Sequence, residues 1–100
     1  QVTGVINHGD WDSIILLGDS EAKSFNSQKD FEFIEISNQP IMELKNNIMD
    51  KLKGKINGTE VALSIASGDG KQHMALISAL LSLPVGIRFA VLTKDGIVFM

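Results

Sequence analysis

The residues best suited to chemistry lie in one short loop at positions 67–71, with the sequence SGDGK. The loop separates an apolar run at residues 61–66 from a longer apolar segment, Met74 to Leu83. This order predicts a buried strand, a glycine turn and a helix. Glycines let the backbone approach a bound group closely, and a helix start offers unpaired N–H groups and the positive end of a dipole. Such a loop suits an anion such as phosphate.

The spacing of the loop matches neither GxGxxG nor GxxxxGK[ST], so it fits no named nucleotide-binding fingerprint. Spacing alone therefore favours an ordinary tight connection without a ligand. A second loop, at residues 18–21, also follows a predicted strand. Because ligands of parallel α/β sheets bind beyond the carboxyl ends of the strands, two such loops at one edge strengthen the hypothesis of a binding site.

Composition limits the classes of function. One hundred residues, 44% hydrophobic and 21% charged, predict one folded domain over residues 1–100. A net charge of −3 argues against binding to duplex nucleic acid. The absence of cysteine excludes disulfides, cysteine zinc sites and thiol nucleophiles, and fits a cytoplasmic protein. With two histidines, we expect no structural metal and no cofactor. We also expect no signal peptide.

Apolar runs and turn residues predict the order of the elements. Val2, Val5 and Ile6 suggest a short first strand, and residues 13–18 and 31–36 suggest two more. A helix then begins at Pro40, with Asn38 as a plausible N-cap. Its apolar stripe comprises Ile41, Leu44, Ile48 and Leu52, and it ends at Gly54. After the strand at residues 61–66 and the helix, a strand at residues 87–92 pairs with residues 97–100 across a hairpin turn.

The expected fold class is therefore α/β: a single Rossmann-like domain with a mostly parallel sheet flanked by helices and an antiparallel C-terminal hairpin. The strand at residues 61–66 is expected to be central. The lysines at positions 51, 53 and 55 are interpreted as a solvated helix end that complements the dipole, in preference to a phosphate patch.

The segment from Met74 to Leu83 is apolar on nearly every face. A helix on a sheet needs only one apolar stripe, so we expect a partner subunit to cover the rest, which predicts a homodimer through this helix. We expect Ala75, Ile77, Leu80 and Leu81 to be buried. Pro84, Gly86 and Arg88 interrupt the only stretch that resembles a membrane span, so we expect no membrane partner.

The sequence SIASGDGKQHMALISALLSLPVGIRFAVLTKDGIVF resembles the C-terminal half of the CRISPR-associated Rossmann-fold (CARF) sensor domains, and SIILLGDSE is similar to an earlier strand of that family. The resemblance implies a homodimer that binds cyclic oligoadenylate across its two-fold axis in antiviral signalling. Carried over residue by residue, it implies ligand contacts at Asp19, Ser20, Ser67, Gly68, Gly70 and Lys71. Asp69 and Gly70 stand where a second glycine and a threonine are common, and no effector domain is present in these 100 residues.

Three hypotheses follow. The first is a homodimeric binding or sensor domain for a nucleotide-type phosphorylated ligand, with Lys71 supplying charge. The second is a metal-independent phosphodiesterase acting on such a ligand, for which Lys71 and His73 are the adjacent candidates; no catalytic residue is assigned, because His73 is equally explained by a structural hydrogen bond. The third is an interaction protein without a ligand.

Overall fold

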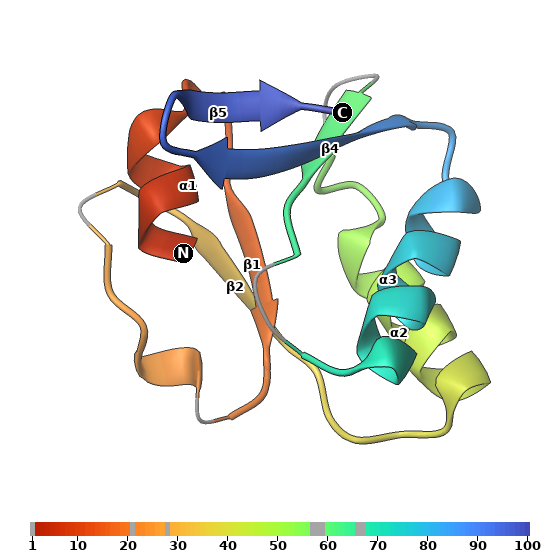
Figure 1. Cartoon of the computed structure of the whole chain (residues 1–100). Coiled ribbons are helices and arrows are strands. Elements are labelled where there is room, and N and C mark those ends of the chain that lie inside the picture. Colours follow the sequence, from red (N-terminus) through yellow and green to blue (C-terminus); the bar gives the residue numbers. More distant parts are fainter. Residues whose placement is uncertain (1, 21, 28, 57–59, 66–67) are drawn as a thin grey trace.

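A computed structural model describes residues 2–20, 22–27, 29–56, 60–65 and 68–100, and these form three α-helices, one 3-10 turn and five strands (Figure 1). The helices are α1 (Val2–His8), α2 (Ile41–Leu52) and α3 (Gly70–Leu81), and the 3-10 turn is η1 (Ala22–Ser24). The strands are β1 (Ile15–Gly18), β2 (Glu32–Glu35), β3 (Glu60–Leu63), β4 (Gly86–Thr93) and β5 (Gly96–Phe99). The chain is therefore of the mixed α/β class, as predicted.

The strands lie in two small sheets. β1 and β2 pair in parallel, with Leu16 opposite Phe33. In the other sheet β4 lies between β3, which is parallel to it, and β5, which is antiparallel. The predicted C-terminal hairpin is confirmed, and Gly96 has the positive φ (107°) that its turn requires. The described strands do not form the single, mostly parallel sheet that the sequence predicts.

β3 is shorter and more exposed than predicted. Exposure alternates along it, with Glu60 and Ala62 exposed and Leu63 buried. One face of the strand is thus open to solvent, and in the described sheet β3 lies at the edge, beside β4. The prediction of a central strand here is wrong, because β4 holds the central position.

The N-terminal segment is a helix, so the predicted first strand is wrong. Val2, Val5 and Ile6 are spaced three and four residues apart, which places them on one helical face. Ile6 is buried, and α1 contacts β4 and β5. The indole Nε1 of Trp11 donates to the carbonyl oxygen of Val5 at 3.0 Å, which fixes the end of the helix.

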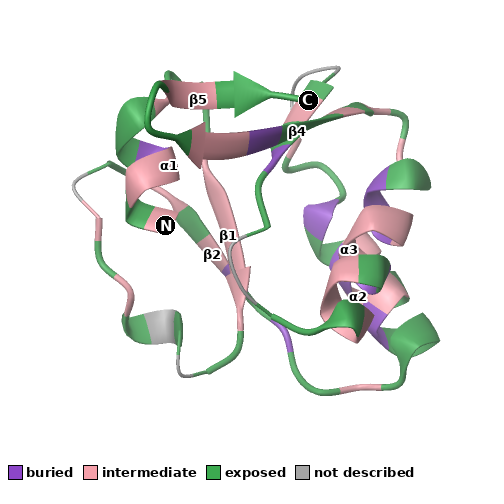
Figure 2. Ribbon diagram, in the orientation of Figure 1, coloured by how far each residue is buried: buried purple, intermediate pink, exposed green. Residues whose placement is uncertain are grey.

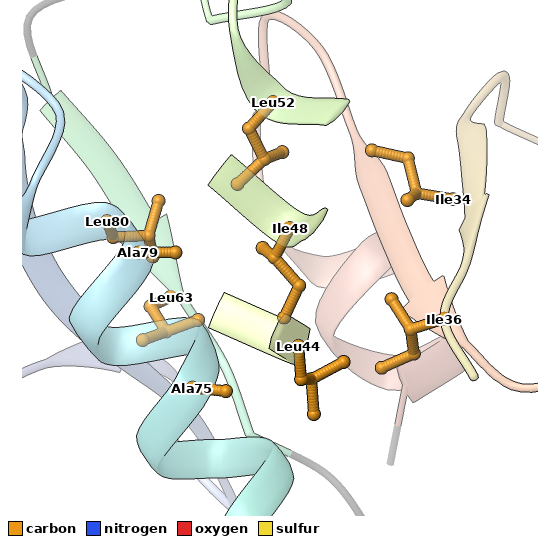
Figure 3. Close-up of a cluster of buried hydrophobic side chains, with 9 residues drawn as sticks. All are labelled: Ile34, Ile36, Leu44, Ile48, Leu52, Leu63, Ala75, Ala79 and Leu80. Carbon is orange, nitrogen blue, oxygen red and sulfur yellow. The ribbon is translucent and has the colours of Figure 1, made fainter. Parts of the chain in front are cut away.

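The core lies where α2 and α3 pack side by side and meet the two sheets (Figures 1 and 3). Leu44 and Ile48 on α2 are fully buried, at 0% exposure, and Leu52 is buried, which confirms these three members of the predicted stripe. Ile41, its first member, is exposed at the start of the helix. The buried cluster comprises Ile34, Ile36, Leu44, Ile48, Leu52, Leu63, Ala75, Ala79 and Leu80. Ile34 and Ile36 come from the β2 region and Leu63 from β3, so this cluster joins both sheets to the two helices.

Two predicted helix ends need correction. α2 is preceded by Pro40 and has no side-chain cap bond, so Asn38 is not its N-cap. Gly54, with φ +77°, follows its C-terminus as expected. α3 begins at Gly70 and not at Met74, because Asp69 caps it. None of the helices in the described ranges is long and apolar enough to cross a bilayer.

α3 buries one face against α2 and leaves the other open, as the burial colours show (Figure 2). Ala75 and Leu80 are buried as predicted, and Ile77 is half-buried. Leu81 is 70% exposed, so its predicted burial is wrong. Successive helical residues lie about 100° apart, and Leu81 therefore points away from the core that holds Leu80.

Candidate functional site

The predicted glycine loop leads into a well-capped helix. The Asp69 carboxylate accepts a hydrogen bond from the Gln72 N–H (2.8 Å), and the Gln72 side chain accepts one from the Asp69 N–H (3.0 Å). This reciprocal pair is a capping box, which the spacing Asp-x-x-Gln allows. A carboxylate of the chain itself thus already sits at the positive end of the α3 dipole.

The two described glycines of the loop have different roles. Gly68 has φ +104°, and a Cβ there would lie 2.7 Å from Gln72 Oε1, so this position needs glycine for the capping box to form. Gly70 has no positive φ, and a Cβ would meet nothing within 4 Å. The fold therefore does not require glycine at position 70. Ser67, the remaining predicted loop residue, lies outside the described residues.

Lys71 extends from α3 to the connection between β2 and α2. Its Nζ donates to Asn38 Oδ1 at 2.5 Å and to the Gln39 carbonyl oxygen at 2.8 Å. The Gln39 side chain in turn accepts a hydrogen bond from Asn47 Nδ2 on α2, at 3.0 Å. We call Asn38, Gln39 and the α3 start at residues 68–71 the Lys71 junction.

Both acceptors of Lys71 are neutral oxygens. An ammonium has three donor hydrogens, and these two bonds account for two of them. Within the described ranges, the salt bridge found joins Lys55 to Glu32 and does not involve Lys71. The side chain is thus held in place by groups that do not neutralise its charge.

The other predicted loop follows β1, the strand that pairs with β2. The Ile36 N–H donates to the Gly18 carbonyl oxygen (2.8 Å), which extends the β1–β2 pairing to within two residues of Asn38. Asp19 and Ser20 are exposed just beyond this point. Asp19 Oδ1 accepts a hydrogen bond from the Ala22 N–H at 3.1 Å, so this carboxylate stabilises the η1 turn.

Sequence reasoning did not identify Asn38 and Gln39 as part of the site. Asn38 also lies just after a predicted strand, and polar residues that follow the strands of a parallel sheet share one edge of it. The position of Asn38 after that strand is the feature of the sequence that points to the site. No residue pattern, however, indicates that a lysine 33 positions later reaches it.

Two of the three lysines near the end of α2 contact residues of β2. Lys51 Nζ donates to the Glu35 carbonyl oxygen at 2.7 Å, and Lys55 forms an ion pair with Glu32. Lys53 is exposed. These contacts give two of the lysines a structural role that the interpretation as a solvated helix end did not include.

Lys71 and His73 do not face the same side of α3. Residues two apart in a helix lie about 200° apart around its axis. Lys71 bonds to Asn38, whereas the His73 ring lies near Gly68, whose added Cβ would be 3.3 Å from Nε2. The two side chains therefore cannot act together on one reacting group in this arrangement.

An open groove of about 440 Å³ runs along the outer face of α3. Met74 is 63% exposed and Leu81 is 70% exposed on this face. The groove is lined by Gly70, His73, Met74, Ile77, Ser78 and Leu81. We call this set the α3 outer face.

Comparisons of the chain with protein-family models, with curated proteins and with solved structures gave no significant match. Within the described residues, no group of three or more His, Asp or Glu side chains could hold a metal ion. The chemistry open to this site is hydrogen bonding and charge pairing by the Lys71 junction.

Proposed function

We propose that the chain is a binding domain for a small phosphorylated ligand, held at the Lys71 junction. The observation that carries the proposal is the fixed Lys71 ammonium, whose two partners are neutral oxygens. A phosphate oxygen would accept the remaining N–H and supply the missing counter-charge. Charge-assisted hydrogen bonds of this kind are about twice as strong as neutral ones.

The start of α3 supports the same proposal. The capping box satisfies the N–H groups of Asp69 and Gln72. The N–H groups of Gly70 and Lys71, in the first helical turn, have no acceptor within the helix. Since Gly70 has no side chain and open space around it, a ligand oxygen could approach these donors closely.

The nucleotide class of the ligand comes from the resemblance to CARF sensor domains, which also supplies cyclic oligoadenylate as the first candidate. Asp69 places a negative charge beside the Gly70 and Lys71 N–H groups, and this charge would repel the negative phosphate group of the ligand. We therefore expect modest affinity, and a preference for ligands with few charges per phosphate group, such as phosphodiesters.

We do not extend the proposal to cleavage of the ligand. A phosphodiesterase would need one group to activate a ribose hydroxyl and another to stabilise the phosphorus. Lys71 and His73, the adjacent candidates, lie on different sides of α3.

Titration calorimetry tests the proposal. The probes are cyclic tetra-adenylate, ATP and inorganic phosphate, and the variants are Lys71→Gln and, as a matched control, Lys53→Gln. Glutamine keeps a hydrogen-bond donor and removes the charge. We expect Lys71→Gln to weaken binding by about tenfold or more, the effect of losing roughly 1.4 kcal/mol, with Lys53→Gln near wild type. Equal weakening by both variants, or no binding of any probe near 1 mM, would overturn the proposal.

A further inference from the structure

The orientation of the Asn38 side-chain amide is fixed by its partner. Lys71 Nζ lies 2.5 Å from Asn38 Oδ1. An ammonium can only donate hydrogen bonds, so the atom of the amide that faces it must be the oxygen. The two ends of an asparagine amide are often hard to tell apart, but the chemistry of this contact distinguishes them. The nitrogen, Nδ2, is therefore the branch of the amide that Lys71 does not contact.

Asn38 Nδ2 has no protein acceptor in the part of the chain that the structure describes. The side chain of Asn38 is exposed, and its hydrogen bond there is the one to Lys71. The neighbouring amides differ, because Asn47 Nδ2 donates to Gln39 Oε1 at 3.0 Å. Asn38 thus holds the Lys71 ammonium with its oxygen and presents two N–H hydrogens to solvent beside it.

We propose that Asn38 Nδ2 is a further ligand donor of the Lys71 junction, and that the junction recognises the phosphate group of a nucleotide and not its base. The inference rests on the proposed function. Two non-bridging oxygens of one phosphate group would accept hydrogen bonds, one from Lys71 Nζ and the other from Asn38 Nδ2. Oδ1 and Nδ2 are bonded to the same carbon, so these two donors are neighbours. An ionised phosphodiester carries only acceptors on its two non-bridging oxygens, which matches this pair of donors.

The same orientation disfavours recognition of an adenine base by Asn38. An asparagine reads adenine through two bonds, in which its oxygen accepts from N6 and its nitrogen donates to N7. Oδ1 of Asn38 already accepts from Lys71. An adenine amino group would have to approach that oxygen beside the ammonium, and the positive hydrogens of the two donors would repel each other. The free end of Asn38 is suited to an oxyanion.

Asn38→Asp tests the donor while keeping the support of Lys71. Aspartate retains the oxygen that faces the ammonium and replaces Nδ2 with a carboxylate oxygen of similar size. The variant should melt no lower than wild type, because the contact with Lys71 becomes charge-assisted at both ends. Its affinity for cyclic tetra-adenylate in titration calorimetry should fall about tenfold or more, since a donor is replaced by a negative acceptor. The control is Asn46→Asp, which adds the same charge at an exposed position of α2 and should bind like wild type.

The side-chain NH₂ signals of Asn38 in the ¹H–¹⁵N NMR spectrum of the wild-type chain give a readout that a purely structural role would not move. They should shift when cyclic tetra-adenylate is added and stay in place with adenosine, which has the same base and no phosphate.

The outcomes separate this inference from the proposed function. If cyclic tetra-adenylate binds while the Asn38 NH₂ signals stay in place, or if Asn38→Asp binds it like wild type, the inference is overturned, and the response of Lys71→Gln decides the proposed function separately. Equal shifts of these signals with adenosine would also overturn it. If no phosphorylated probe binds the wild-type chain, both fail together.

Discussion

The hydrogen bonds of Lys71 join segments that lie more than 30 positions apart in the chain. They connect the start of α3 to Asn38 and Gln39, and so fix the loop from which α2 begins. The same side chain that we propose as a ligand anchor therefore also contributes to the stability of the fold. These two roles can be separated experimentally, because stability depends on both hydrogen bonds and anion binding depends on the charge.

Lys71→Met should lower the free energy of unfolding by about 1–2 kcal/mol. The variant removes hydrogen bonds from a charged donor to two oxygens, one of them part-buried, and leaves the acceptors to solvent. Urea denaturation would measure the loss, with the exposed Lys53→Met as control. If both variants unfold at the wild-type midpoint, the contacts of Lys71 do not stabilise the protein.

The two loop glycines should respond oppositely to alanine. Gly68→Ala should cost about 1–2 kcal/mol, because φ is +104° and the new Cβ would crowd Gln72 Oε1. Gly70→Ala should raise stability by about 0.5–1 kcal/mol, since the helix accommodates a methyl group at that position without contact. Thermal unfolding of both variants would check this. Equal destabilisation would mean that the start of α3 is placed wrongly.

Asp69→Asn should strengthen binding of a phosphorylated ligand by several-fold. Asparagine caps a helix about as well as aspartate, so stability should change little, whereas the negative charge beside the first-turn N–H groups is removed. Calorimetry with the ligand that binds wild type best measures the change. A weaker complex, with the fold intact, would indicate that the ligand is not an anion held at this helix start.

At the scale of the elements, the packing of α2 against α3 carries most of the core. Leu44→Ala should cost about 2–5 kcal/mol, because the side chain is fully buried and its removal leaves a cavity. Leu80→Ala should fall in the same range, whereas the neighbouring Leu81→Ala should cost about 1 kcal/mol or less, because Leu81 is 70% exposed. Denaturant unfolding measures all three. Similar losses for Leu80 and Leu81 would contradict the orientation of α3.

The elements differ in how far the sequence predicts them. α2 was well determined, because its apolar stripe extends over three turns and Gly54 marks its end. The segment of α1 was predicted as a strand, because Val2, Val5 and Ile6 are β-branched and turn residues follow them. In the structure, Ile6 is buried and α1 packs against β4 and β5. Contacts with strands more than 75 residues away cannot be predicted from the residues of α1 alone. The contacts of Asn38 with Lys71 were unpredictable for the same reason.

At the scale of the whole molecule, the core cluster joins two small sheets that do not share a described strand pair. The apolar residues at positions 61–65 indicate burial, but they do not distinguish a central strand from an edge strand. Which strands pair is decided by contacts between distant segments. Of the two loops that the sequence indicated, the one that leads into α3 bonds to residues that follow β2, Asn38 and Gln39.

The most direct test of the proposed function is to map ligand-induced amide shifts in the ¹H–¹⁵N NMR spectrum during titration with cyclic tetra-adenylate. The largest shifts should fall on Asn38, Gln39, Gly70 and Lys71, with smaller ones at Asp19 and Ser20, and Lys71→Gln should reduce them. Shifts concentrated at residues 51–55, where the other lysines gather, or shifts that Lys71→Gln leaves unchanged, would contradict the proposed function.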